Sequence, residues 1–254
     1  MAGHSKWANI KHKKGAADAK RGKTFTRLSK EVIMAAKMGG SDPDANARLR
    51  TAINAAKAAN MPNDNIERAV KKGAGELEGQ VMEELSYECY GAGGIALIIS
   101  CLSDNRNRTA ADIRHIITRN NSVLANSGTV NWMFHRKARF LIEGEAANEE
   151  TLMELLLDND VDIDDIIMDE NTAEILAEPN SFDGIVAVLE AAGITPSESS
   201  IAMVPENRTQ VEDAKTATQL FRLIDALEEN DDVQEVSSNL DISDELMAQL
   251  AEEE

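Results

Sequence analysis

The chain has 254 residues and a formal net charge of −19; 43% of its residues are hydrophobic and only 4% are aromatic. This length predicts two or three domains, and the scarcity of aromatic side chains argues against base stacking as the main mode of binding. Its two cysteines, Cys89 and Cys101, are too few for a four-ligand zinc site or a secreted disulfide scaffold. A reducing cytoplasm fits this cysteine content, and because residues 1–14 are polar and basic and the longest strongly apolar run is about 95–102, we expect neither a signal peptide nor a membrane span.

Charge is distributed very unevenly along the chain. Residues 1–72 carry 16 Lys and Arg against 6 Asp and Glu, residues 73–140 carry 7 of each, and residues 141–254 carry 3 against 32. Basic side chains that neutralise phosphates release condensed counterions, and this release supplies most non-specific affinity for nucleic acid. A solvated charged surface is the alternative explanation. We favour nucleic acid, because a basic segment in an acidic protein would otherwise associate with the acidic half.

The chain begins with a pattern typical of a basic tail that leads into a helix. Residues 1–22 hold mostly small, polar and basic side chains, and we expect them to form an unpacked tail. From Thr24 a helical period separates apolar from basic positions. The apolar side carries Phe25, Leu28, Val32 and Ala36, and the opposite side carries Lys23, Arg27, Lys30 and Lys37.

Two further helices are predicted after the glycine pair that ends the first. Asp42 and Pro43 have the residue types of an N-cap and a first helical position, and this second helix should run to about Asn60. A third helix is expected over 63–73. Together they form a small helical domain over residues 23–75.

A strand period replaces the helical one after a glycine-rich linker. The expected elements are strands over 84–90 and 95–102, a helix over 109–119 and a strand over 129–134. The segment Gly91-Ala92-Gly93-Gly94 is followed by a strand, whereas phosphate-binding loops are followed by a helix. We therefore expect it to be a tight hairpin turn.

Residues 137–204 show the order β-α-β-β-α-β, which is that of ferredoxin-like domains. Its expected strands are 140–142, 164–168, 172–176 and 200–204, and its helices are 149–158 and 181–192. A later helix (214–229) and strand (232–236) need a sheet to join, and the incomplete middle sheet is available. The sequence thus predicts an α+β protein of three domains, with the ferredoxin-like domain inserted into a middle domain formed by 80–136 and 205–240. Residues 241–254 should form an acidic tail.

The candidate nucleic-acid contacts are basic side chains of the amino-terminal segment and of one strand-to-helix junction. They are Lys6, Lys11, Lys13, Lys14, Lys20, Arg21, Lys23, Arg27, Lys30, Lys37, Arg106 and Arg108. At the junction, free backbone N–H groups and the helix dipole favour an anion. The alternative is simple capping, in which Thr109 and Asp112 form a capping box. Capping leaves the two arginines unexplained, so both explanations stay open.

Patterns typical of catalysis or of a bound metal are missing from the sequence. It contains neither a G-x-S-x-G elbow nor an H-E-x-x-H helix, and His4 and His12 have no partner at ligand spacing. The acidic half singles out no pair of carboxylates and fits a solvated surface that would turn the basic end toward polyanions. We expect a non-enzymatic protein with no cofactor, metal or small-molecule substrate.

Several motifs resemble the YebC/PmpR family over nearly the whole chain. They are Met1 to Trp7, Asp42 to Arg50, Asn60-Met61-Pro62, Asp104 to Thr109, Ser127 to Val130 and Asp231 to Val236. The resemblance implies a three-domain cytoplasmic protein of this architecture. It also implies a probable DNA-binding transcriptional regulator, or else a ribosome-associated translation factor like the family's mitochondrial relative, which would bind rRNA and aid synthesis of proline-rich stretches.

Three hypotheses follow. A transcriptional regulator would bind duplex DNA, although the sequence shows no clear helix-turn-helix or dimerisation helix. A ribosome-associated factor would let a flexible basic arm follow rRNA phosphates. A small-molecule enzyme would require a pocket between domains that holds acidic groups with perturbed pKa values.

Overall fold

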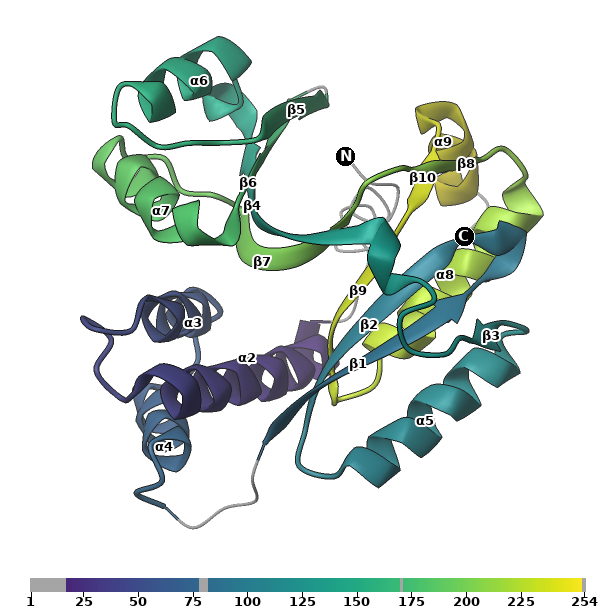
Figure 1. Ribbon diagram of the computed structural model, residues 1–254, viewed down its shortest axis with the longest axis horizontal. Coiled ribbons are helices and arrows are strands. Elements are labelled where there is room, and N and C mark those ends of the chain that lie inside the picture. The colour runs from purple at the N-terminus through teal and green to yellow at the C-terminus, as the bar shows by residue number, and fades with distance from the viewer. Residues whose placement is uncertain (1–16, 78–81, 170, 253–254) are drawn as a thin grey trace.

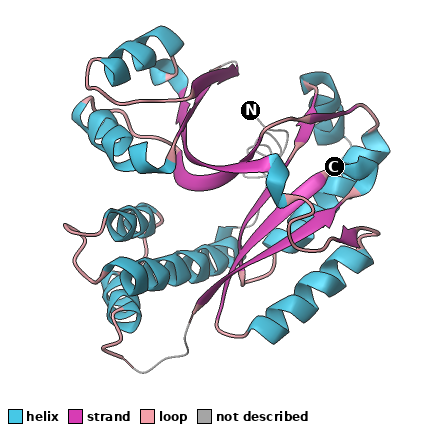
Figure 2. Cartoon of the chain, viewed as in Figure 1, coloured by secondary structure: helices cyan, strands magenta, loops and turns pink. Residues whose placement is uncertain are grey.

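The computed structural model describes residues 17–77, 82–169 and 171–252 (Figure 1). Helices and mainly antiparallel strands are mixed along the chain (Figure 2), which confirms the predicted α+β class. Four short 3-10 turns, η1 to η4, connect larger elements, at Ala92–Gly94, Asn131–Met133, Gly144–Ala146 and Pro179–Ser181.

Three amino-terminal helices, α2 (Ala17–Gly39), α3 (Ala47–Ala58) and α4 (Asn63–Gly73), pack together at one end of the molecule. Their shared core consists mainly of small side chains, namely Val32, Ala35, Ala36, Leu49, Ala52 and Ala69. Because these side chains are small, helix backbones approach closely. At Gly73 an added Cβ would meet the carbonyl oxygen of Ile33 at 2.3 Å, so α4 can cross α2 only with glycine at this point.

Two predicted boundaries in this region are wrong. Because α2 begins at Ala17, residues 17–22 are helical rather than part of a tail, and the remainder of the predicted tail lies outside the described residues. The helix α3 begins at Ala47 because Asn46, not Asp42, is its N-cap. The Asn46 side chain accepts a hydrogen bond from Leu49 N at 3.1 Å and donates to the carbonyls of Ala35 and Gly40 at 2.9 and 2.8 Å.

The middle sheet has the strand order β3-β1-β2-β9, from β1 (Glu83–Tyr90), β2 (Ala96–Ser103), β3 (Val123–Leu124) and β9 (Val233–Ser238). β1 and β2 form the predicted hairpin, with Tyr90 opposite Ala96. Its turn places Gly93 and Gly94 at φ angles of 67° and 74°, which glycine adopts without steric cost. β9 pairs with β2, which confirms that the late strand completes this sheet.

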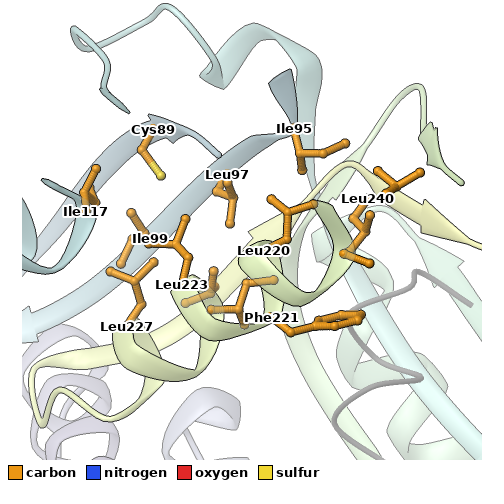
Figure 3. Packing of buried hydrophobic residues seen from close by; sticks show 14 of the residues in the cluster. Cys89, Ile95, Leu97, Ile99, Ile117, Leu220, Phe221, Leu223, Leu227 and Leu240 are labelled. Atoms are coloured by element: carbon orange, nitrogen blue, oxygen red, sulfur yellow. The ribbon is translucent and has the colours of Figure 1, made fainter. Parts of the chain in front are cut away.

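Two helices, α5 (Arg106–Arg119) and α8 (Ala214–Glu228), cover one face of the middle sheet. Leu97 and Ile99 of β2 pack against Leu220, Leu223 and Leu227 of α8 in a large apolar core (Figure 3). The chain after β9 belongs to the same core, so the predicted acidic tail is wrong over residues 241–252. There β10 (Leu240–Ile242) pairs with β8 (Thr209–Val211), and α9 (Asp244–Glu252) buries Leu246, Met247 and Leu250.

The second four-stranded sheet has the order β5-β6-β4-β7 with antiparallel pairing throughout. Its elements follow the predicted β-α-β-β-α-β order: β4 (Phe134–Glu143), α6 (Glu149–Leu157), β5 (Asp165–Asp169), β6 (Thr172–Ala177), α7 (Phe182–Ala191) and β7 (Glu198–Pro205). α6 and α7 cover one face, where Phe140 stacks on Phe182 with ring centroids 4.9 Å apart.

The strand predicted over 129–134 is wrong, because only Phe134 of that range belongs to a strand. The preceding loop is organised by Glu88, whose side chain is buried. Its carboxylate accepts backbone N–H hydrogen bonds from Gly128, Val130 and Asn131 at 2.5 to 3.0 Å. These N–H groups therefore serve a side chain and not a strand ladder.

Candidate nucleic-acid interface

The predicted contact residues fall into three structural classes. Lys6, Lys11, Lys13 and Lys14 lie outside the described residues, as do His4 and His12. Lys20 and Arg21 lie within α2, and the structure describes their backbone only. The remaining six have described side chains.

The lysines on the basic side of α2 contact backbone carbonyl groups of neighbouring elements, while Lys23 and Lys37 remain exposed. Lys23 donates to the carbonyl oxygen of Glu229 at 3.1 Å, Lys30 to that of Asp231 at 2.8 Å, and Lys37 to that of Met82 at 2.8 Å. These contacts engage part of each ammonium group within the fold, and phosphate contact by these lysines stays a prediction. An amphipathic pattern marks the polar side of a helix, but it cannot distinguish water from the carbonyl groups of a neighbouring element.

The buried carboxylate of Asp232, the residue that directly precedes β9 in the chain, connects α2 to α5. Its oxygens accept from Lys30 Nζ at 2.5 Å, Arg108 NH2 at 2.9 Å, Thr109 Oγ1 at 2.7 Å and Ser103 Oγ at 3.1 Å. We call these five residues the Asp232 junction. Asp232 is only 4% exposed. Burial by itself raises the pKa of Asp232, but the hydrogen bonds from Lys30, Arg108 and Thr109 outweigh it and lower this pKa from 3.8 to about 2.

The alternative that the sequence left open, a capping box of Thr109 and Asp112, is wrong. Asn105 is the N-cap and accepts from Arg108 N at 3.1 Å, while Thr109 is buried in the Asp232 junction. The guanidinium of Arg108 also pairs with Asp104 at 3.0 Å. The hydrogen bonds to Asp232, followed by that to Asp104, raise the pKa of Arg108. Arg108 thus has a structural role although its side chain is 48% exposed, and Arg106 is exposed as well.

Within the described residues, several basic side chains are exposed and make no ion pair. On the amino-terminal helices they are Lys57 of α3 and Arg68 and Lys71 of α4. On α5, which covers the middle sheet, they are Arg106, Arg114 and Arg119. Arg27 of α2 is half-buried and likewise without an ion pair there. Sequence reasoning missed all of these except Arg27 and Arg106. Arg68 and Lys71 are three residues apart, a spacing that places them on one side of α4 and could have been read from the sequence.

A cleft of about 830 Å³ opens between α2, α3, the middle sheet and the β7 and α7 side of the second sheet. Arg48 lies in its wall and bridges Glu31 and Glu84, at 2.7 and 2.9 Å. The other charged lining residues are Arg27, Arg136, Asp183, Glu198 and Glu235. Acidic groups outnumber basic ones here, so the cleft does not suit a polyphosphate chain.

Contacts within the fold explain why some carboxyl groups have a shifted pKa. In the described part of the chain they are Glu88, Asp213 and Asp232, and each lies outside the lining of the cleft. For Glu88, burial raises the pKa but backbone hydrogen bonds outweigh this effect and lower it. The described part of the chain also contains no group of three or more His, Cys, Asp or Glu side chains arranged to hold a metal ion.

Two family models match the chain in succession. The model described as the TACO1/YebC protein N-terminal domain matches residues 5–76, and the model described as the TACO1/YebC second and third domain matches residues 82–240. The chain belongs to the TACO1/YebC family. Membership confirms the family resemblance of the sequence motifs.

Relatives of this TACO1/YebC protein are similar over their full length. It is 50% identical to a probable transcriptional regulatory protein of Desulfotalea psychrophila, with 99% of this chain and 100% of the relative covered. A protein of the same name from Halothermothrix orenii is also 50% identical, with 100% of both chains covered. The crystal structure of a conserved hypothetical protein from Aquifex aeolicus is 42% identical with a TM-score of 0.84, covering 92% of this chain and 96% of that one.

The names of these relatives support a regulatory role for the TACO1/YebC protein described here. Its described helices include none that is both long and apolar enough to cross a membrane.

Proposed function

We propose that this protein is a non-enzymatic regulator of gene expression that works in the cytoplasm by binding nucleic acid, with duplex DNA as its target. The observation that carries the proposal is the concentration of positive charge in residues 1–72, where 16 basic side chains stand against 6 acidic ones in a chain of net charge −19. The relatives named probable transcriptional regulatory proteins support the choice of DNA.

The proposed contact residues are those basic groups that the fold leaves available or does not describe. They are Lys6, Lys11, Lys13, Lys14, Lys20, Arg21, Arg27 and Arg106, together with the α4 residues Arg68 and Lys71. Lys23, Lys30, Lys37 and Arg108 also stay among the proposed contacts, although each already donates hydrogen bonds within the protein. An ammonium group has three donors and a guanidinium group five, so a phosphate can be bound beside those bonds, and at Arg68 and Lys71 it would replace only water.

We further propose that the chain is divided into three domains: residues 23–75, residues 80–136 with 205–240, and residues 137–204. Separate hydrophobic cores within the three groups of elements support this division. The acidic groups are concentrated after residue 141. Their repulsion of a polyanion would orient the molecule with its helical region toward nucleic acid.

The proposal is tested by measuring the affinity of the full chain for a labelled 25-base-pair duplex, a scrambled duplex and a single-stranded RNA of equal length over a series of salt concentrations. We expect tight binding to duplex DNA, with log K falling linearly as log salt rises at a slope of about −0.9 for each phosphate neutralised. A variant with Arg68→Gln and Lys71→Gln should bind less tightly and show a shallower slope. The variant Lys215→Gln and Arg222→Gln removes the same charge from exposed positions of α8 and is the matched control.

Each result bears on a different part of the proposal. Preference for one duplex over its scrambled form supports specific transcriptional regulation, whereas equal affinity for both with steep salt dependence rejects it. Stronger binding to RNA than to DNA overturns the choice of DNA in favour of a ribosomal target. Absence of salt-dependent binding to any of the three molecules overturns the proposal as a whole.

A further inference from the structure

We propose that the outer edge of β7 is a docking site for an extended, basic segment of a partner protein, which adds to the second sheet as a further strand. The inference goes beyond the proposed function, because it concerns a protein partner and a surface away from the amino-terminal segment. The site consists of the five β7 residues that line the cleft, and we call it the β7 edge. They are Glu198, Ser199, Ser200, Ile201 and Met203.

The β7 edge has no neighbouring strand. β7 is the last strand in the order β5-β6-β4-β7, so it pairs with β4 alone. The outer edge of such a strand presents N–H and C=O groups that can pair with another chain. In the described residues, positions 198–204 make no backbone hydrogen bond outside their ladder with β4. β7 forms the border of the second sheet nearest α2 and α3 (Figure 1), and the cleft lies between them.

β7 lacks the features that protect the other edges of the two four-stranded sheets. β3 has two residues, β5 has five with an aspartate at each end, and β9 carries Glu235. β7 has eight residues, and none of the six between Glu198 and Pro205 is charged. Proteins usually protect an exposed edge by shortness, charge or proline. A long, uncharged edge beside a cleft of about 830 Å³ is therefore suited to receive a strand.

The charges around the β7 edge favour a basic partner. Glu198 stands at the start of β7 with a side chain that is 50% exposed, and Asp183 of α7 is exposed in the same lining. The lining residue Arg48, by contrast, is already bound by two carboxylates. Because acidic lining groups outnumber basic ones, lysine or arginine side chains of a partner would find opposite charges there.

The dimensions of the site suit a short extended segment. The five positions from Glu198 to Met203 correspond to roughly 17 Å of strand, so a segment of about five or six residues would span them. When a strand is added to a sheet edge, main-chain hydrogen bonds supply affinity and alternate side chains supply specificity. Ile201, which is 37% exposed, offers an apolar contact for one of those side chains.

The test measures the affinity of the full chain for a fluorescent eight-residue peptide that alternates lysine and valine, called here the lysine peptide. We expect saturable binding. The same peptide methylated on every backbone nitrogen keeps its charge but donates no N–H hydrogen bond, and it should bind roughly tenfold more weakly. A peptide that alternates glutamate and valine should also bind roughly tenfold more weakly. Equal affinity for the lysine peptide and its methylated form overturns the inference, because charge alone would then explain binding.

Two pairs of matched variants locate the site. Ile201→Lys places a like charge on the β7 edge and should weaken binding of the lysine peptide roughly tenfold. Val123→Lys adds the same charge at an exposed position of β3 and should change the affinity by less than about twofold. Asp183→Asn should weaken binding roughly two- to fivefold, as expected for an exposed ion pair, while Asp162→Asn should not. Equal effects within either pair contradict the assigned location.

Hydrogen exchange locates the peptide without any substitution. A saturating concentration of the lysine peptide should slow exchange of the amides within residues 198–203 severalfold. It should leave the amides of β5, the opposite edge of the same sheet, unchanged. Protection that is confined to other parts of the chain overturns the inference.

Light scattering of the protein alone tests a different occupant of the β7 edge, a second copy of this chain. A dimer that Ile201→Lys converts to a monomer would show that a second copy covers the edge, and it would overturn the choice of a partner peptide. A natural protein that stays monomeric, together with the expected peptide binding, supports that choice. The duplex titration measures the proposed function separately, so either proposal can fail without the other.

Discussion

Replacing Asp232 by asparagine should loosen the attachment of the amino-terminal helices to the middle sheet. The substitution keeps the size of the side chain but removes its charge and one hydrogen-bond acceptor. Lys30 and Arg108 then lose their common counter-ion, and their side chains are 16% and 48% exposed. Arg108 can turn toward water, whereas Lys30 is held in a more buried position, so most of the cost should arise at Lys30.

The size of the effect follows from the titration of Asp232. Its pKa is about 2 in the folded protein, compared with an ordinary value of 3.8. At about 1.36 kcal/mol for a tenfold change in proton affinity, this difference corresponds to about 2.5 kcal/mol in favour of the ionised form. Removing one partner of a buried pair typically costs about 3–5 kcal/mol. Because Arg108 is half exposed, we expect about 2–3 kcal/mol.

Urea unfolding followed by circular dichroism measures this loss, with Asp162→Asn as an exposed control that should change stability by less than about 0.5 kcal/mol. The pH dependence follows from the lowered pKa. Stability from the Asp232 carboxylate is fully present above about pH 4 and is lost as the pH falls toward 2. The difference between the natural protein and Asp232→Asn should therefore be constant from pH 7 to 5 and shrink below pH 4.

A double-mutant cycle with Lys30→Met isolates the contribution of the ion pair. We expect a coupling free energy of about 1–2 kcal/mol between positions 30 and 232. A loss below about 1 kcal/mol in Asp232→Asn, or zero coupling to Lys30, would refute the assignment of the Asp232 junction as the connection between α2 and the sheet.

Three further predictions concern other parts of the fold. Glu88→Gln should lower the free energy of unfolding by about 1–3 kcal/mol, because the amide accepts hydrogen bonds from the loop's backbone N–H groups less well than the carboxylate does. Amide hydrogen exchange at Gly128 and Val130 should accelerate, and unchanged protection there would contradict the role of Glu88. Leu220→Ala should lower the free energy of unfolding by about 2–5 kcal/mol through a cavity in the core, as measured by urea denaturation against a Leu157→Ala control at an exposed position. Burial raises the pKa of Cys89 and Cys101 to about 12, so both thiols should resist iodoacetamide at pH 8 until urea unfolds the chain, and rapid native alkylation would show that the core opens locally.

Local sequence patterns were sufficient to predict most elements of this protein. Alternating and helical periods located the hairpin, the β-α-β-β-α-β series and the late helix and strand of the middle sheet, because burying one side of a regular element leaves a repeating apolar pattern. Counting charges by segment revealed the basic amino-terminal region. The acidic residues after position 241 concealed a helix, since charge dominated the composition although Leu246, Met247 and Leu250 have helical spacing.

The sequence by itself determined the α+β class, the order of the elements and the separation of charge along the chain. Only the tertiary structure decided which polar groups face water. Lys30 and Arg108 look alike in sequence to Lys71 and Arg114, yet Asp232 binds the first two, whereas the other two form no ion pair with the described residues. The reason is physical: a helical period reports which side of an element is apolar, while the partner of a polar side depends on contacts between residues more than a hundred positions apart.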